Sequence, residues 1–384
     1  MRCHSISSTI TDGYRAGGEL GESLRAISPE VVLLFASINY ESQFADVFDG
    51  LNDALDRPAI IFGGTSDGIY ETDRAVHHGL GALGLNSDGA VRWAVTVESG
   101  VDADSSAAAH RCAERVIEEL GGHADFAFAF ADGVKADGSS IAAGLSAVLA
   151  IPFIGGLAAD DRKFTASWIF AHGRTHQNAV GLLAARGPIS VRINSASGWH
   201  PEGATGVVEE CSGSTVQRIS GMTPQEFLRE QTGKAPGETD LGFVPFATYH
   251  PESNGHYFLR TPSHFDPETG AATMFGSVEK NATVRICSAT REDVLKGVEQ
   301  ALKPTQQPGF TPCGALVVSC AGRKWLLEDR CYEEVEQVMQ ALGRRIPLVG
   351  MPTFGEMGPF LGEDGTCTPT FFHNVTFVVC LFGE

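Results

Sequence analysis

Residues 57–70 read RPAIIFGGTSDGIY and, together with VVLLFAS at residues 31–37, decide the fold that we expect. Both runs are apolar and as long as strands, which is typical of strands covered on both faces. A helix is predicted between them, because apolar residues recur there at steps of three and four: Phe44, Val47, Phe48, Leu51 and Leu55. A strand, a helix and a second strand in this order favour parallel pairing of the two strands.

The same pattern occurs twice more along the chain. The second copy has DFAFAFADG at residues 125–133 and IPFIGGLAADD at residues 151–161, and the third has GALVVSCAGRK at residues 314–324 and IPLVGMPTFGEMG at residues 346–358. Apolar faces of helices lie between these strands: Ile141, Leu145, Val148 and Leu149 in the second copy, and Val335, Val338, Met339 and Leu342 in the third. We therefore predict a mixed α/β (α+β) fold of repeated strand–helix–strand units with added antiparallel strands, in a two-part architecture.

The second strand of each copy begins just after a proline and ends at glycine, which permits a sharp turn and close approach of a ligand. Ligands of open α/β sheets bind beyond the carboxyl ends of the strands. The candidate binding residues at these ends are therefore Gly63, Gly64, Thr65, Ser66, Asp67, Gly155, Gly156, Asp160, Asp161, Thr353, Gly355 and Glu356. Two interpretations stay open: the glycines either wrap a ligand with their N–H groups or only close tight turns, and the acids either bind an ammonium group or cap turns.

Cys320 and, three residues later, Arg323 lie at the end of the first strand of the third copy, and we place His373 and Asn374 on the last strand. A nearby cation lowers the pKa of a thiol, so a Cys320–His373 nucleophile is one hypothesis. The alternative is a buried cysteine that packs as a small apolar side chain. Arg323 fits a carboxylate clamp or a structural salt bridge equally well. His373 and Asn374 either face the pocket or tie the last strand to its neighbour.

Charge and composition exclude several classes of partner. The formal net charge is −19, from 28 Lys+Arg and 47 Asp+Glu, so nucleic acid and anionic membrane surfaces are poor partners. The nine cysteines form neither a CxxC pair nor a disulfide framework, which indicates a reducing compartment. We see no secretion signal in the first residues and no apolar run of the ~20 residues that a membrane span needs. We therefore expect a cytoplasmic protein.

The histidines offer no pattern of metal ligands, and we expect no metal and no obligate cofactor. Haem needs only one strong protein ligand and an apolar slot, so spacing does not decide against it. The histidines that could supply this ligand lie in a Pro/Gly-rich stretch: His250, His256 and His264.

The order and spacing of several short motifs resemble the FIST family over nearly the whole chain. In the C-terminal third these are Ser319–Arg323, Pro347–Gly350, Thr353–Glu356 and His373–Thr376. In the N-terminal part they are Phe35–Ser37, Gly63-Gly64, Gly155–Asp160 and Gly198–Gly203. The chain departs from the family pattern at Met351-Pro352, where aromatic residues are expected, and at His200, where a basic residue is more usual.

The resemblance implies a lead-in at residues 1–27, a FIST N-terminal domain at 28–222 and a FIST C-terminal domain at 223–384. It further implies a sensory module, and not an enzyme, that binds a small polar ligand such as an amino acid between the two halves. No kinase, receiver or cyclase region is attached, so the signal would pass to a partner protein in trans. Some family members bind haem to sense nitric oxide, which keeps that alternative open beside a Cys320-dependent hydrolase or transferase. The oligomeric state is left undetermined.

Overall fold

The computed structural model describes residues 1–233, 244–253, 255–306, 308–362 and 364–384. Three units with the same order of elements make up most of it. The first unit consists of β1 (Arg2–Ser8), α1 (Gly13–Leu24), β2 (Val31–Ser37), α2 (Phe44–Ala54), β3 (Ile60–Ser66), the hairpin β4 (Ile69–Glu71) and β5 (Arg74–Val76), and β6 (Leu80–Asn86). The second consists of β7 (Arg92–Ser99), α3 (Val101–Leu120), β8 (Phe126–Ala131), α4 (Gly138–Ser146), β9 (Ile154–Leu157), the hairpin β10 (Ile169–Ala171) and β11 (Arg174–His176), and β12 (Ala179–Arg186).

The third unit follows the same order but contains a long insertion after its first strand. Its own elements are β13 (Ser190–Ala196), α6 (Arg291–Leu302), β21 (Pro312–Cys320), α7 (Ala321–Leu327), α8 (Glu333–Leu342), β22 (Leu348–Thr353), β23 (Glu356–Gly358), β24 (Phe371–His373) and β25 (Phe377–Gly383). The inserted elements are β14 (His200–Ser212), β15 (Thr215–Ile219), α5 (Pro224–Thr232), β16 (Phe246–Tyr249), β17 (Tyr257–Arg260), β18 (Pro262–Phe265), β19 (Ala272–Met274) and β20 (Thr283–Ser288).

Each unit forms one six-stranded sheet, and the units exchange their hairpins in a circle. The strand orders are β1-β6-β2-β3-β10-β11, β7-β12-β8-β9-β23-β24 and β13-β25-β21-β22-β4-β5. The hairpin that follows β3 therefore joins the third sheet, the one after β9 joins the first, and the one after β22 joins the second. The pairs β2/β3, β8/β9 and β21/β22 are parallel, which confirms the prediction from the repeated pattern.

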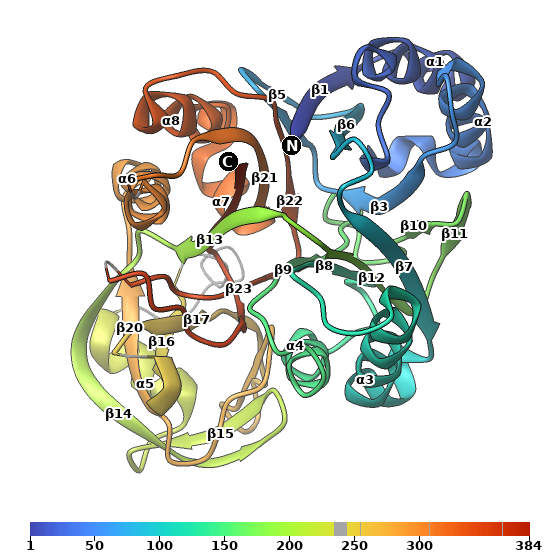
Figure 1. Cartoon of the computed structure of the whole chain (residues 1–384). Coiled ribbons are helices and arrows are strands. Elements are labelled where there is room, and N and C mark those ends of the chain that lie inside the picture. Colours follow the sequence, from blue (N-terminus) through green and yellow to red (C-terminus); the bar gives the residue numbers. More distant parts are fainter. Residues whose placement is uncertain (234–243, 254, 307, 363) are drawn as a thin grey trace.

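The three sheets enclose one shared core and carry their helices on the outside, as Figure 1 shows. The shared core takes apolar residues from all three sheets, among them Phe35, Phe128, Phe130, Val318 and Met351. Each sheet buries its other face under its own helices in a separate apolar cluster. Because both faces of every central strand are covered, these strands are apolar throughout, as their sequences indicate.

Residues 1–27 are more than a lead-in, since β1 pairs with β6 and α1 packs on α2. The sequence GYRAGGELGESL of α1 contains three interior glycines, which disfavour a helix locally. Tertiary packing outweighs this preference: a Cβ atom on Gly17 would lie 2.1 Å from the Val47 carbonyl oxygen, and one on Gly50 would lie 2.0 Å from that of Tyr14. The glycines allow the backbones of the two helices to touch.

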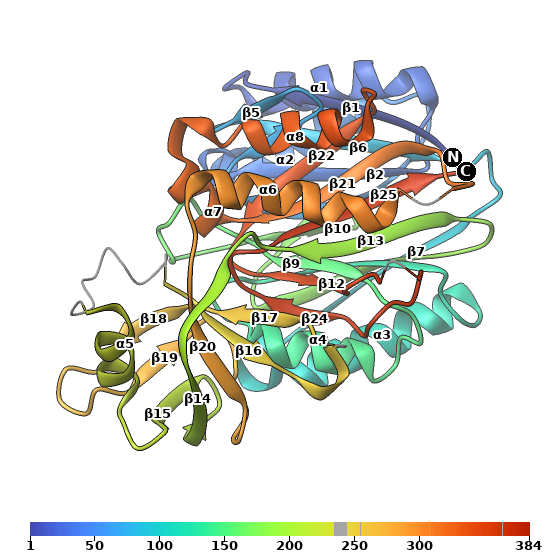
Figure 2. The same ribbon diagram turned by 90° about the vertical axis from the view of Figure 1, so that its left-hand side faces the viewer.

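The insertion forms a seven-stranded sheet, β17-β16-β20-β14-β15-β19-β18, that extends from one side of the three units (Figure 2). Its helix α5 begins with a capping box formed by Thr223 and Glu226. The boundary predicted at residues 222/223 falls between β15 and α5, and the inserted sheet continues on both sides of it. Among the described residues, none of the helices has the length and apolar character that crossing a membrane requires.

Candidate functional site

The segments that follow β3, β9 and β22 meet where the three units join. Three equivalent hydrogen bonds link them in a circle: the N–H of Asp67 donates to the Pro352 carbonyl, that of Ala159 to Thr65, and that of Phe354 to Leu157, each at 3.0 Å. The carboxyl ends of the second strands are therefore brought together, as the sequence led us to expect.

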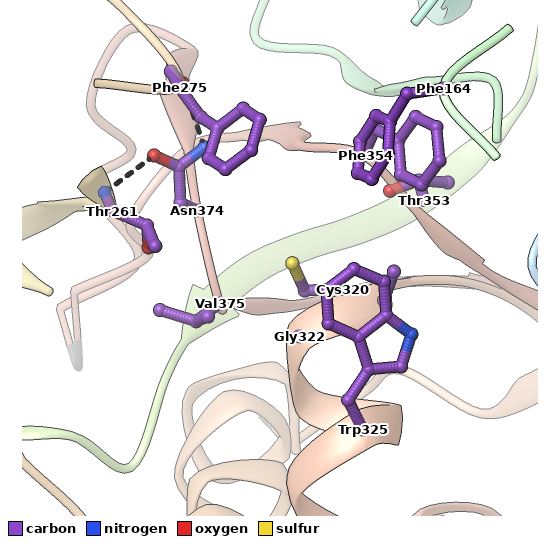
Figure 3. A pocket seen from close by; sticks show the side chains of 11 residues that line it. Phe164, Thr261, Phe275, Cys320, Gly322, Trp325, Thr353, Phe354, Asn374 and Val375 are labelled. Atoms are coloured by element: carbon purple, nitrogen blue, oxygen red, sulfur yellow. Dashed lines mark hydrogen bonds between the residues drawn. The ribbon is translucent and has the colours of Figure 1, made fainter. Parts of the chain in front are cut away.

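A pocket opens beside this junction, and we call it the Cys320 pocket. Its lining residues are Phe164, Thr261, Phe275, Cys320, Ala321, Gly322, Trp325, Thr353, Phe354, Asn374 and Val375. They come from the second unit, the third unit and the insertion. Figure 3 shows the sulfur atom of Cys320 pointing into the space between the rings of Phe275 and Phe354. Cys320, Thr353 and Asn374 are the predicted site residues that line the pocket; their contact with a ligand stays a prediction.

Three phenylalanine rings cover the pocket. The ring centroid of Phe164 lies 4.3 Å from that of Phe354 and 6.2 Å from that of Phe275, both in stacked geometry. Phe164 and Phe275 are 42% and 39% exposed, which is unusual for large apolar side chains. We call these three rings the aromatic cover.

Asp160 holds one part of this cover in place. Its buried carboxylate accepts hydrogen bonds from the N–H groups of Phe164, Thr165 and Ala166 at 2.8, 2.6 and 3.0 Å. The loop that it anchors contains left-handed backbone at Asp161, Arg162 and Phe164. Asp160 therefore positions Phe164, and its carboxylate oxygens already serve that loop.

Cys320 differs from its counterparts in the other two units. By strand register, Ser37 and Asp132 occupy the same position at the ends of β2 and β8. Each of them accepts a hydrogen bond from the returning chain, from the N–H of Gly79 to Ser37 Oγ at 3.0 Å and from that of Asn178 to Asp132 Oδ2 at 2.7 Å. The Cys320 sulfur takes the corresponding bond from Val375 and lies against the carboxyl group of Glu356.

The Cys320–Glu356 pair is held in its uncharged form. Burial raises the pKa of the Cys320 thiol well above its ordinary value, and the Glu356 carboxyl raises it further. Burial also raises the pKa of Glu356 to about 8, although the N–H of Thr376 bonds to this carboxyl at 3.0 Å. At neutral pH the pair therefore offers hydrogen bonds and not a nucleophilic thiolate.

The backbone beside Cys320 is strained. Val375 has a φ of 48°, and a β-branched residue in this left-handed region is an outlier that costs about 1–3 kcal/mol. Asn178 occupies the equivalent place in the second unit with a φ of 50°, and asparagine tolerates it far better. Asn374 fixes the strained turn, because its side chain accepts from the N–H of Thr261 and donates to the carbonyl of Phe275, both at 3.0 Å.

A charged cluster lies behind Trp325, where all three units meet. The buried carboxylate of Asp67 accepts from Trp325 Nε1 at 2.8 Å and pairs with Lys324 Nζ at 3.3 Å. Burial raises the pKa of Asp67 to about 6, opposed by Lys324 and assisted by a hydrogen bond with Asp161. The guanidinium of Arg162 lies over the Trp325 ring, 3.9 Å from its centre. Asp67 thus supports one wall of the Cys320 pocket without lining it.

The glycine pairs lie within the strands and do not line the Cys320 pocket. A Cβ atom on Gly63 would lie 1.9 Å from the Leu34 carbonyl oxygen, and one on Gly64 would lie 2.3 Å from that of Trp168. A Cβ atom on Gly156 would lie 2.9 Å from the side chain of Val318. These glycines, and Gly155 beside them, allow neighbouring strands to approach closely and do not close the tight turns that the sequence suggested as the alternative to ligand binding.

Three further predicted residues serve the backbone around the strand ends. Thr65 Oγ1 accepts from the N–H of Trp168 at 3.1 Å, and Ser66 Oγ donates to the Gly68 carbonyl at 2.8 Å. Gly355 packs under the ring of Phe372, which a Cβ atom would approach to 2.4 Å. These contacts shape the loops that carry the pocket.

Arg323 forms a structural salt bridge in the interior of the third unit. Its side chain is fully buried, and its Nε lies 2.7 Å from Glu334 Oε1. It also donates to the carbonyls of Ser197 and Val294, the latter at 2.8 Å. Because all these partners are groups of the protein itself, Arg323 acts here as a structural salt bridge and not as a clamp for a ligand carboxylate.

His373 donates from Nε2 to the Gly358 carbonyl at 2.9 Å, and burial lowers its pKa to about 4. Of the histidines considered for haem, His250 pairs with Glu279 at 3.9 Å, His256 stacks on Phe360, and His264 is exposed. Among the described residues, no histidine lines the Cys320 pocket, so we place no haem there and derive no role for one.

Sequence reasoning missed the aromatic walls. Trp325 lies five residues after Cys320, on α7, where the predicted helix began later in the chain. Phe164 and Phe275 come from loops without a periodic pattern, and pairing across about one hundred residues leaves no local signal in one sequence. Phe354 belongs to the motif Thr353–Glu356, but the sequence does not predict that its ring stacks on Phe164.

Comparisons with known proteins agree with these observations at the level of the family. Residues 30–222 match the model of the FIST N domain, and residues 224–359 match that of the FIST C domain. Uncharacterised proteins of Mycobacterium bovis and Mycobacterium tuberculosis are each 27% identical over 199 residues, which is 49% of this chain and 49% of theirs. The chain thus spans about half the length of these curated relatives.

Among solved structures, a cyanuric acid hydrolase is similar with a TM-score of 0.33 and 8% identity, covering 99% of this chain and 100% of the other. A chorismatase is similar with a TM-score of 0.34 and 10% identity, covering 100% and 98%. Likenesses this weak support no argument about the function of this chain.

Proposed function

The chain belongs to the FIST family, whose domains are sensory modules for small ligands, and we propose that it senses a small molecule in the Cys320 pocket and signals to a partner protein in trans. The observation that supports this most is the aromatic cover. Its rings come from three separate segments, and two of them are exposed. Exposed apolar side chains that gather in one place, in contrast to singly scattered ones, are typical of binding sites, and this supports the proposal.

The walls favour an uncharged ligand with a flat, partly apolar body. Four of the lining side chains are aromatic, and none is charged. The hydroxyl of Thr261 is buried and has no hydrogen-bond partner among the described residues, so it offers one polar contact. A free amino acid would bring two charges that this pocket does not neutralise, at a substantial desolvation cost. We therefore revise the expected polar ligand to a neutral one.

Signal transmission follows from the connections of the cover. Phe275 belongs to the insertion, Phe164 to the second unit and Phe354 to the third. The pocket has a volume of only ≈ 50 Å³, so a ligand that enters beneath the aromatic cover displaces its rings and changes the contacts among the three parts. It shifts the arrangement only if it binds one arrangement more tightly. Asn374 joins the insertion to the third unit at this point and would transmit the change.

A thermal-shift screen tests the proposal. Neutral aromatic and heteroaromatic molecules should raise the melting temperature, because binding to the native state stabilises it, while zwitterionic amino acids should not. Phe164→Ala should abolish the shift. Tyr332→Ala is the matched control, since Tyr332 is 43% exposed and lies outside the pocket. A neutral ligand that acts equally on both variants, or a response confined to amino acids, would contradict the proposal.

A further inference from the structure

A second cavity lies between α4, the strands β16 and β17 of the insertion, and β24. It has a volume of ≈ 300 Å³ and includes Ser139, Thr248, His250, Phe258, Arg260 and Phe372 in its walls. Arg260 and Thr261 are neighbours in the chain, and they line this cavity and the Cys320 pocket respectively. We call the second one the Arg260 cavity; it plays no part in the function proposed above.

Arg260 is only 4% exposed and carries a charge without a direct counter-charge. Its Nε donates to the Ser277 carbonyl at 2.8 Å, and its Nη1 donates to the carbonyls of Leu259 and Phe372 at 3.1 and 2.9 Å. Among the described residues no carboxylate forms an ion pair with it. Asp137 and Glu279 act on it only over longer distances. Burying an unpaired charge is costly, so an anion that reaches this guanidinium would be held firmly.

One end of the guanidinium is still available. A guanidinium has five N–H donors, and among the described residues Nη2 has one hydrogen-bond partner, Ser139 Oγ, at a long 3.4 Å. The rings of Phe258 and Phe372 lie 4.4 and 5.5 Å from the guanidinium carbon and fix its plane. A carboxylate fits such a preorganised donor well.

The remaining walls decide the class of anion. The cavity is lined by small side chains of α4, Ala142, Ala143 and Ser146, and by the rings of Phe258 and Phe371. This surface suits an apolar body. Glu252 and Glu279 also line the cavity and disfavour a multiply charged anion such as phosphate.

We propose that the Arg260 cavity binds a small organic carboxylate, with its charged end on Arg260 Nη2 and Ser139 Oγ and its apolar end against α4. The site is independent of the Cys320 pocket and takes a different class of ligand. Neither the match to the family nor the aromatic cover assigns it.

Benzoate and butyrate, compared with benzamide and butyramide, test this proposal on the full chain. Both carboxylates should raise the melting temperature at concentrations up to tens of millimolar, and the amides of the same shape should not. Inorganic phosphate should have no effect beyond that of a chloride solution of equal ionic strength. Equal shifts with amide and carboxylate, or no shift with either carboxylate, would overturn the assignment.

Variants locate the binding. Arg260→Met should remove the response, but loss of a buried arginine can also prevent folding. Ala143→Phe keeps Arg260 and fills the cavity from an exposed helical position, so it should abolish the shift in a folded protein. Ala147→Phe is the matched control, because Ala147 is exposed on the next turn and does not line the cavity. An unchanged benzoate response in Ala143→Phe would show that the anion binds elsewhere.

Discussion

At the scale of single residues, Cys320 and Glu356 decide what the pocket can do. The sequence offered Cys320 with Arg323 and His373 as a reactive group, but Arg323 is engaged with Glu334 and His373 with Gly358. Glu356 was expected only as a carboxylate at a strand end. Its contact with Cys320 depends on the pairing of β23 with β9 and β24, which a single sequence does not reveal.

The buried thiol should be slow to react. We expect iodoacetamide at neutral pH to label Cys320 more slowly than Cys367. Cys320 is buried and its pKa is raised well above the ordinary value, whereas Cys367 is exposed and burial raises its pKa only to about 11. Peptide mass spectrometry measures both rates in one sample. Faster labelling of Cys320 would favour a nucleophilic role instead.

Glu356→Gln should change how stability depends on pH. The pKa of Glu356 in the folded protein is about 8, above its ordinary value of 4.5, so the folded state binds its proton more tightly than the unfolded state. Its contribution to stability is present below about pH 4.5 and is lost as pH rises through 8. The free energy of unfolding of Glu356→Gln, relative to that of the wild type, should therefore rise between these values. Urea unfolding at each pH measures both free energies. A difference between Glu356→Gln and the wild type that stays constant with pH would argue against a buried, protonated Glu356.

At the scale of elements, loops carry the exposed rings of the aromatic cover, and the strands hold these loops in place. The Pro-to-Gly strands were recognisable in sequence because their apolar runs repeat three times. Phe164 and Phe275 were not, because their positions depend on side-chain hydrogen bonds to distant backbone, such as those of Asp160 and Asn374.

Asp160→Asn should release the loop that carries Phe164. The amide replaces one acceptor oxygen with a donor that faces N–H groups, which costs about 1–3 kcal/mol of stability. A larger effect is expected on ligand affinity, because the aromatic cover loses one ring. Calorimetric titration with a hit from the neutral screen measures this, and Asp266→Asn is the control, since Asp266 caps an exposed turn of the insertion in a similar way. If Asp160→Asn and Asp266→Asn bound the ligand with equal affinity, Asp160 would have no role in shaping the pocket.

At the scale of the whole molecule, the three units meet at Asp67, Lys324, Trp325 and Asp161. The repeated pattern predicted three strand–helix–strand copies, but not that each unit lends its hairpin to the next sheet. These hairpin strands are three residues long, and their partners lie far away in sequence, so no local preference specifies them. Because the hairpins are exchanged, we expect the stability of the contact between the three units to depend on pH.

Asp67→Asn should remove a pH-dependent loss of stability at the contact between the three units. Burial raises the pKa of Asp67 to about 6 from 3.8, so its contribution to stability falls as pH rises between these values. The gain in free energy of unfolding of the variant over the wild type should grow across this window, by up to about 3 kcal/mol. Chemical unfolding at several pH values measures it. If the gain in free energy of unfolding shrank as pH rises, the pKa of Asp67 would be lowered by folding and not raised.

Hydrogen–deuterium exchange with and without a neutral ligand shows directly whether the ligand binds in the Cys320 pocket. We predict slower exchange at residues 160–166, 273–277 and 320–325, which carry the aromatic cover and the wall at Trp325. A ligand that stabilises the protein but leaves these three segments unchanged, while protecting others, would contradict binding in the Cys320 pocket.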